Sequence, residues 1–172
     1  MATAASKQAA QAAAEEPEFD PTLDSWQVNY ARLLSHVMQK GFQVGGLVGC
    51  LVVAPIVFYR ARQGGTTAAV PKAVNAVFKT VMASTAASTA MAVARMASID
   101  NMKEGLEDRA YRLHYNQGQV RTDHFAQIGT LVGGTAAVAL LPASAAAVVA
   151  GGAAGAAVGV LAHVATAPKP EE

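Results

Sequence analysis

The sequence is poor in charged and in aromatic side chains. Of its 172 residues, 15% are charged and 6% are aromatic, while 52% are hydrophobic. A soluble domain carries roughly a quarter charged residues, so this composition favours a membrane protein. The shortage of aromatic rings excludes a core built from bulky side chains, because Ala and Gly supply much of the apolar content instead.

Other absences exclude whole function classes. A single cysteine excludes a disulfide framework and a cysteine-based zinc site. The 13 basic and 12 acidic residues nearly balance, which excludes a generic polybasic nucleic-acid binder. No phosphate-binding loop, HExxH motif or nucleophile elbow is found. We therefore expect no catalytic, cofactor-binding or metal-binding residue, no small-molecule substrate and no nucleic-acid partner. The expected protein is not an enzyme, although it is compatible with membership in a multi-subunit oxidoreductase.

A long segment that ends shortly before the C-terminus has no charged residue. Residues 125–168 contain none, and this length is about twice the ~20 residues that one helix needs to cross a bilayer. Pro142 divides the segment. It therefore predicts a hairpin of two spanning helices, residues 125–141 and about 144–167.

The first hairpin is expected at residues 41–99. Its first span covers residues 41–59, which carry no charge. Its second charge-free segment, residues 80–94, is short for a span. The helix can start near Pro71 and run to Ile99 if Lys79 snorkels toward the membrane surface from one turn inside.

The predicted fold is thus an all-α integral membrane protein with four short transmembrane helices in two hairpins. The alternative is a soluble, Ala-rich helical bundle. A soluble helix needs a polar face, and the C-terminal hairpin offers almost none. The predicted segments are a mobile tail (1–24), an amphipathic interfacial helix (25–40), the first hairpin (41–99), a polar helical loop (100–124), the second hairpin (125–167) and a tail (168–172).

Glycines recur at intervals of four within the predicted spans. This spacing places them on one face of each helix and lets two backbones approach closely. A general Ala and Gly bias of the composition is the alternative. The predicted helix-packing positions are Gly41, Gly45, Gly49, Gly129, Gly133, Gly151, Gly155 and Gly159.

Two polar segments outside the spans are candidate contact sites. The first loop, residues 60–79, has basic residues and no acid, so it suits anionic lipid headgroups such as cardiolipin, or it serves only to fix topology. The interfacial helix and the second loop carry aromatic and basic residues that suit docking onto a neighbouring subunit. The alternative for the helix is a position at headgroup level, and the alternative for the loop is a plain solvated surface. The candidate lipid contacts are Arg60, Arg62, Lys72 and Lys79, and the candidate docking residues are Trp26, Tyr30, Arg109, Tyr111, Arg112 and Tyr115.

The glycine faces and the basic first loop make the chain resemble the Tim family of mitochondrial inner-membrane proteins. Arg95, Asp100 and Asn101 match in outline the Arg, Asp and Asn that this family often has after its second span. The long loop before residue 125 departs from the compact family form. The family includes import-translocase channel subunits, an accessory subunit of respiratory complex I and relatives in plastid envelopes.

The resemblance implies both termini in the intermembrane space and the first loop in the matrix. The expected function is that of a structural accessory subunit of a respiratory assembly, most of all complex I, with other membrane subunits and lipids as partners and cardiolipin as the bound lipid. A channel or scaffold component of an import translocase and a plastid-envelope solute channel are the alternatives.

Overall fold

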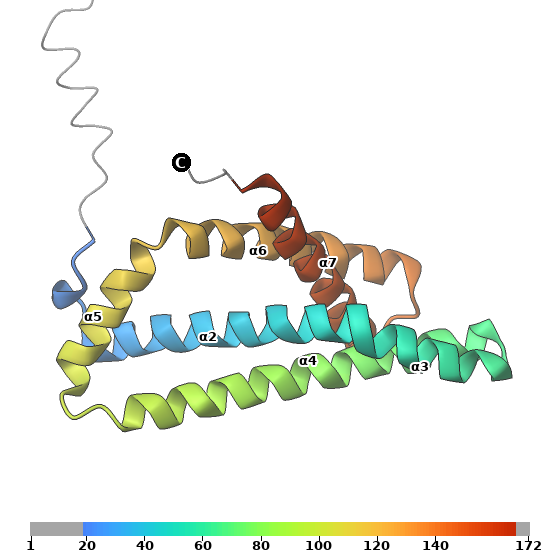
Figure 1. Ribbon diagram of the computed structural model, residues 1–172, viewed down its shortest axis with the longest axis horizontal. Coiled ribbons are helices and arrows are strands. Elements are labelled where there is room, and N and C mark those ends of the chain that lie inside the picture. The colour runs from blue at the N-terminus through green and yellow to red at the C-terminus, as the bar shows by residue number, and fades with distance from the viewer. Residues whose placement is uncertain (1–18, 168–172) are drawn as a thin grey trace, which may run out of the picture.

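The computed structural model describes residues 19–167 and is helical throughout that range, without strands. Two long helical rods lie side by side, and a helical hairpin crosses one face of the pair (Figure 1). The elements are η1 (Pro21–Leu23), α2 (Trp26–Val48), η2 (Gly49–Val53), α3 (Ala54–Ala61), η3 (Arg62–Gly64), α4 (Thr66–Ala97), α5 (Met102–His114), α6 (Gln117–Leu140) and α7 (Ala145–Thr166). The predicted tail at 168–172 and most of the one at 1–24 lie outside the described residues.

The first rod is one continuous helix from α2 through η2 into α3. The expected boundary at residues 40 and 41, between an interfacial helix and a span, falls inside α2, which runs through it without a break, and the place where this helix enters a membrane stays a prediction. Near its middle the rod widens into the π-helical turn η2, where the Ala54 N–H donates to the Gly49 carbonyl. The cause is Pro55, which has no N–H and whose ring would clash with the carbonyl four residues earlier in a regular α-helix.

The predicted basic loop at residues 60–79 is mostly helix, which corrects the sequence interpretation. The chain reverses within η3 and Gly65, and α4 begins at Thr66. Pro71 is the sixth residue of α4, so it lies inside the helix and removes the hydrogen bond that its N–H would donate to the Thr67 carbonyl. The true turn is short because Gly65 adopts φ 98°, a conformation that side chains with a Cβ rarely adopt.

Gly65→Ala is expected to destabilise the first hairpin by about 1–3 kcal/mol, the cost of forcing a Cβ into this backbone region. Gly64→Ala is the control, since a Cβ at Gly64 would meet nothing within 4 Å and its φ is not positive. The measurement is the free energy of unfolding by SDS titration of the full chain in detergent micelles. Equal effects of the two substitutions would contradict the conformational argument.

The rods are antiparallel, and their register is set by three glycines of the first rod. Gly41 lies opposite Thr85, Gly45 opposite Val81 and Gly49 opposite Val77. In this register the charge-free segments 41–59 and 80–94 are shifted relative to each other along the helix axes. They lie side by side over only about two turns. Residues 41–59 are level instead with the first two-thirds of α4.

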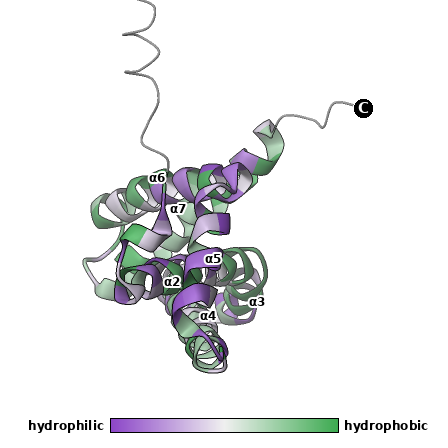
Figure 2. Ribbon diagram, turned by 90° about the vertical axis from the view of Figure 1, so that its left-hand side faces the viewer, coloured by the Kyte–Doolittle hydropathy of each residue, from purple (hydrophilic) through white to green (hydrophobic). Residues whose placement is uncertain are grey.

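The rest of the chain forms α5 and the α6–α7 hairpin. The predicted polar loop at residues 100–124 is only in part a separate unit: α5 occupies its first half and is mostly hydrophilic (Figure 2), but α6 already begins at Gln117. Ser144 caps α7, with its side-chain oxygen accepting a hydrogen bond from the Ala147 N–H at 3.1 Å.

The core lies where the two rods meet α7. Val77 and Val81 of α4 pack there against Ala150 and Ala153 of α7, and Phe42 of α2 covers them. The core is small, as expected for a chain with few bulky side chains, and most large apolar residues face outward.

Three helical segments are long and apolar enough to cross a membrane, namely the run Trp26–Gly64, α4 and α7. α6 is not among them. Its first turns carry Arg121, Asp123 and His124, which lower its mean hydropathy. The four-span arrangement therefore stays a prediction, whereas the all-helical class with several helices able to span is what the structure shows.

Candidate functional site

The glycines of α2 face α4 across a close interface. An added Cβ at Gly41 would lie 2.8 Å from Thr85 Cα, and one at Gly45 would lie 2.8 Å from Val81 Cα. Cβ atoms do not approach backbone atoms so closely, so these two positions have no room for a side chain. Gly49 is less tightly enclosed, since its nearest neighbour would be Val77 Cγ1 at 3.3 Å.

The glycines of α6 and α7 face one another in a reciprocal contact. A Cβ at Gly129 would meet the Gly155 carbonyl, and a Cβ at Gly155 would meet the Gly129 carbonyl. Gly133 and Gly151 are related in the same way, while Gly159 lies against the Phe125 carbonyl. The backbones of the hairpin thus touch directly, the geometry in which dispersion and weak Cα–H···O contacts hold membrane helices together.

One further packing glycine was missed among the predicted positions. Gly46 faces α7, and a Cβ there would lie 2.6 Å from the Ala153 carbonyl. Successive helical residues point about 100° apart, so the pair Gly45 and Gly46 serves two interfaces, with α4 and with α7. The adjacent glycines were the signal in the sequence.

The four candidate lipid-contact residues do not form one site. Arg60 and Arg62 lie at the hairpin turn, where the Arg62 guanidinium stacks 4.2 Å from the Tyr59 ring centroid. Lys72 and Lys79 lie two turns apart on α4. All four side chains are exposed, and no ion pair joins any of them to a carboxylate within residues 19–167.

The candidate docking residues gather at the end of the molecule where α2 begins and α5 packs against it. Trp26, Tyr111 and Tyr115 are exposed, and the two tyrosine rings lie 4.6 Å apart. Tyr30 is half-buried on α2. The two arginines are engaged within α5, since Arg109 donates to the Gly105 carbonyl and Arg112 pairs with Asp108 at 3.0 Å.

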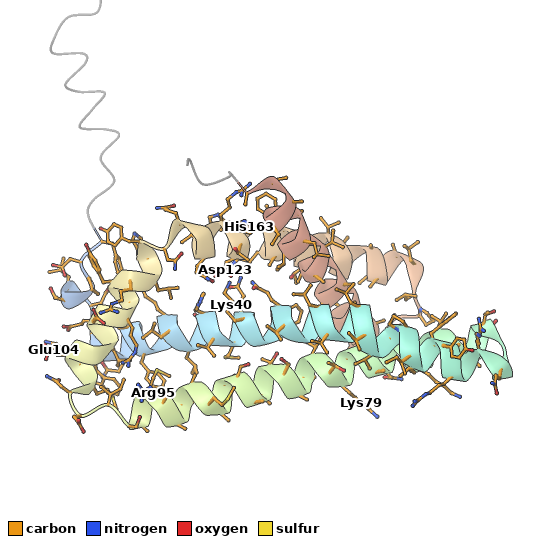
Figure 3. The ribbon with its side chains drawn as sticks, viewed as in Figure 1. Lys40, Lys79, Arg95, Glu104, Asp123 and His163 are labelled. Atoms are coloured by element: carbon orange, nitrogen blue, oxygen red, sulfur yellow. The ribbon has the colours of Figure 1, made fainter. Side chains whose placement is uncertain are left out.

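A polar cluster that the sequence did not predict joins α2 to α6. Asp123 of α6 accepts hydrogen bonds at Oδ1 from Lys40 Nζ at 2.6 Å and from Gln43 Nε2 at 3.0 Å. Its Oδ2 lies 3.1 Å from His36 Nδ1. Asp123 and Lys40 face each other between the helices in Figure 3. The carboxylate is largely buried, with 14% of its side chain exposed, so its charge is balanced inside the protein rather than by water.

Two glutamines extend this cluster along the same gap. Gln127 Nε2 donates to Gln39 Oε1 at 3.2 Å, and Gln39 Nε2 donates to the Asp123 carbonyl at 3.4 Å. The signal was present in the sequence as a helical periodicity: residues 36, 39, 40 and 43 share one face of α2, and residues 123 and 127 share one face of α6.

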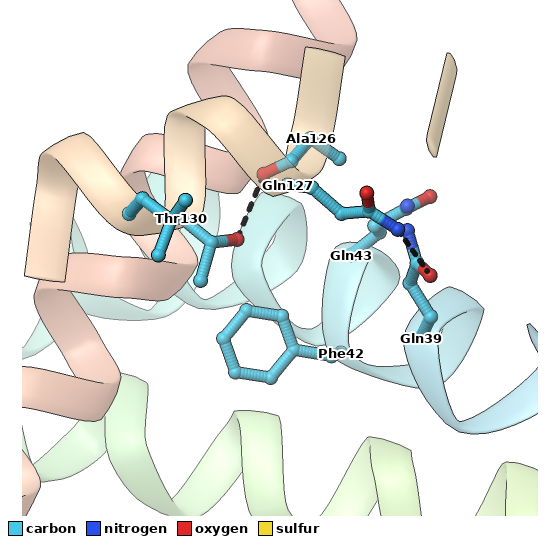
Figure 4. Close-up of a pocket in the computed structure, with 7 residues that line it drawn as sticks. Gln39, Phe42, Gln43, Ala126, Gln127 and Thr130 are labelled. Carbon is cyan, nitrogen blue, oxygen red and sulfur yellow. Dashed lines mark hydrogen bonds between the residues drawn. The ribbon is translucent and has the colours of Figure 1, made fainter. Parts of the chain in front are cut away.

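A groove opens beside the cluster, between α2 and the α6–α7 hairpin. Its first part is a cavity of about 510 Å³ bordered by the three glutamine amides and by Phe42, Thr130 and Leu131 (Figure 4). A second cavity of about 540 Å³ shares those last three residues and continues between aliphatic walls that include Val138 and Val148. The groove therefore passes from a polar end to an apolar end.

These features define the class of protein: a helical protein with glycine-packed interfaces and several helices able to cross a membrane. No group of three His, Cys, Asp or Glu side chains that could hold a metal occurs in residues 19–167. The chain belongs to the family described as proteins of unknown function DUF1757, which it matches over residues 20–167. No curated protein matches it.

Proposed function

We propose that this protein is a non-catalytic structural subunit of a larger membrane assembly, held in place by helix packing and lipid contacts. The observation that carries the proposal is the outward face of α4. This face carries Lys79, which makes no ion pair in residues 19–167, beside small side chains that another helix can approach.

Lys79 lies nearly level with Gly49, because Gly49 faces Val77 and Thr80 across the hairpin. Gly49 is nine residues from Lys40 and eleven from Arg60, or about 14 Å and 16 Å along the helix. A bilayer fitted to the charge-free segment between Lys40 and Arg60 therefore has Lys79 near its middle, not one turn inside its surface as the sequence suggested.

A lysine at this depth is costly when lipid covers it, by about 2.5–3.5 kcal/mol on insertion scales. The Lys79 side chain points away from the bundle in Figure 3, and Ala83, Ala86 and Ala90, at helical spacing along the same rod, are exposed too. A partner helix that carries a carboxylate at the same depth would pair with Lys79 and pack closely on the alanines. The outward face of α4 is thus better suited to contact with another protein than to contact with lipid.

The resemblance to the Tim family supports the mitochondrial inner membrane as the location, with the membrane arm of respiratory complex I as the assembly. The proposed topology has four spans, both termini in the intermembrane space and the turn at residues 62–65 in the matrix. In this arrangement Arg60 and Arg62 meet the matrix-side headgroups, where cardiolipin is the candidate lipid.

A second candidate is a component of a protein-import translocase, and the groove between α2 and the α6–α7 hairpin favours it. A plastid-envelope channel of the same family would share this feature. The groove is mostly apolar beyond its glutamine end, however, which suits a structural or lipid-bound role better than an aqueous path.

The test is a native gel of mitochondrial membranes solubilised in mild detergent, probed for the tagged full chain. Co-migration with complex I is expected, and Lys79→Ala is expected to reduce it severalfold, because the partner carboxylate loses its counter-charge. Lys79→Arg keeps the positive charge at the same position, so this variant should assemble. Lys72→Ala removes a positive charge that lies nearer the membrane edge, so it should assemble too. Migration with import machinery would favour the second candidate, and migration alone would refute the proposal.

A further inference from the structure

We propose that the groove between α2 and the α6–α7 hairpin binds one acyl chain of a glycerophospholipid, with the glycerol ester region at its glutamine end. This inference requires membrane insertion but not membership in any assembly. The site is separate from the exposed arginines and lysines of the first hairpin.

The length of the groove matches one leaflet of a bilayer. It extends along α6 from Gln127 to Val138, eleven residues or about 16 Å. The hydrocarbon region is about 30 Å thick, so this length is about half of it. The polar end is level with Lys40, where the charge-free segment begins, and the apolar end lies toward the bilayer centre.

The walls of the groove have the polarity of a lipid arranged in that direction. At the glutamine end, each amide nitrogen uses one N–H within the cluster and carries a second that can donate to an ester carbonyl. Farther along, the hydroxyls of Thr130 and Thr135 donate to carbonyls of their own helix. Their methyl groups and the neighbouring aliphatic side chains therefore leave an apolar lining.

The two cavities of about 510 and 540 Å³ share Phe42, Thr130 and Leu131 and so form one continuous groove. Because the nearby charges of Lys40 and Asp123 balance each other, we expect little preference for anionic headgroups.

The test uses the full chain in phosphatidylcholine nanodiscs that contain a phosphatidylcholine with a photoreactive diazirine in its acyl chain. Cross-linked residues are mapped by mass spectrometry. We expect labelling of Phe42 and Val149, which line the groove and are half-buried, to exceed that of the exposed Leu140 at least fivefold. Gly134→Leu should abolish this excess, since Gly134 lines the groove and a Cβ there would meet nothing closer than 3.9 Å.

Gly64→Leu is the matched control at an open position outside the groove, and it should leave the labelling unchanged. Val148→Phe fills the groove from α7 and replaces Gly134→Leu if that variant fails to fold. Uniform labelling of groove and outer surface would overturn the proposal, as would cross-links between two copies of the chain at these residues. A preference of more than tenfold for a cardiolipin probe would also overturn it, because it would assign the binding to basic residues.

Discussion

Gly155→Leu is expected to separate α6 from α7 and to destabilise the protein by about 3 kcal/mol or more, at the upper end of overpacking effects. A Cβ at Gly155 would meet the Gly129 carbonyl and would lie 3.0 Å from Gly133 Cα. Both neighbours are backbone atoms, so no side-chain rotation can relieve the clash. The two helices must move apart, and the contacts of Gly151 and Gly159 are lost with those of Gly155.

SDS titration of the full chain in detergent micelles, followed by far-UV circular dichroism, measures this loss. Gly134→Leu is the matched control, because it introduces the same side chain on α6 only one residue from the packed Gly133, yet at a position where a Cβ would meet nothing closer than 3.9 Å. It should change the free energy of unfolding by less than about 1 kcal/mol, the size of a helix-propensity term. Similar losses in both variants would show that the glycine spacing has no packing role.

The helical segments and the direction in which the glycines face could be predicted because both depend on local periodicity. A glycine every fourth residue marks one face of a helix whatever surrounds it, and the structure places Gly41 and Gly45 against α4 and the glycines of α6 against those of α7. The positions of the helix ends were harder to predict. The basic residues at 60–79 predict a loop, but charge does not break a helix, and this stretch turns at η3 and the positive φ of Gly65.

The register between helices could not be derived from the sequence. Nothing local shows that Gly49 lies opposite Val77, so the sequence predicts Lys79 near a membrane surface instead of near the middle of the apolar region. The polar cluster could not be predicted from the sequence for the same reason. Asp123 and Lys40 are 83 residues apart, and each was assigned to a flank of a different span before the fold brought the two together.

These two corrections bear on the function in different ways. Asp123 and Lys40 lie at the edge of the fitted bilayer, whereas Lys79 lies where a bilayer alone would accommodate a charge only at a cost. Asp123 and Lys40 neutralise each other within the chain, whereas Lys79 has no acidic partner in residues 19–167. A lysine without an ion pair in residues 19–167, on a helix of small residues, is the feature that supports the proposed role as a subunit.

Asp123→Leu should be the most disruptive substitution between the two hairpins, with an expected loss of about 3 kcal/mol, the lower end for breaking a buried pair. It removes the acceptor of Lys40 and Gln43 and the neighbour of His36, so Lys40 keeps a largely enclosed and uncompensated charge. Asp123→Asn retains an acceptor oxygen for these donors and should lose less. Asp108→Leu removes the exposed pair with Arg112 on α5 and should change stability by less than about 1 kcal/mol.

A double-substitution cycle with Lys40→Met separates the loss of the pair from the cost of the charge left behind. If the uncompensated lysine causes the instability, the variant with both changes should be more stable than Asp123→Leu alone, by about 1–3 kcal/mol of coupling. SDS titration of the four proteins in the same micelles measures the cycle. Additive losses would mean that Asp123 acts through its other contacts, with Gln43 and His36, and that the ion pair does not hold α6 against α2.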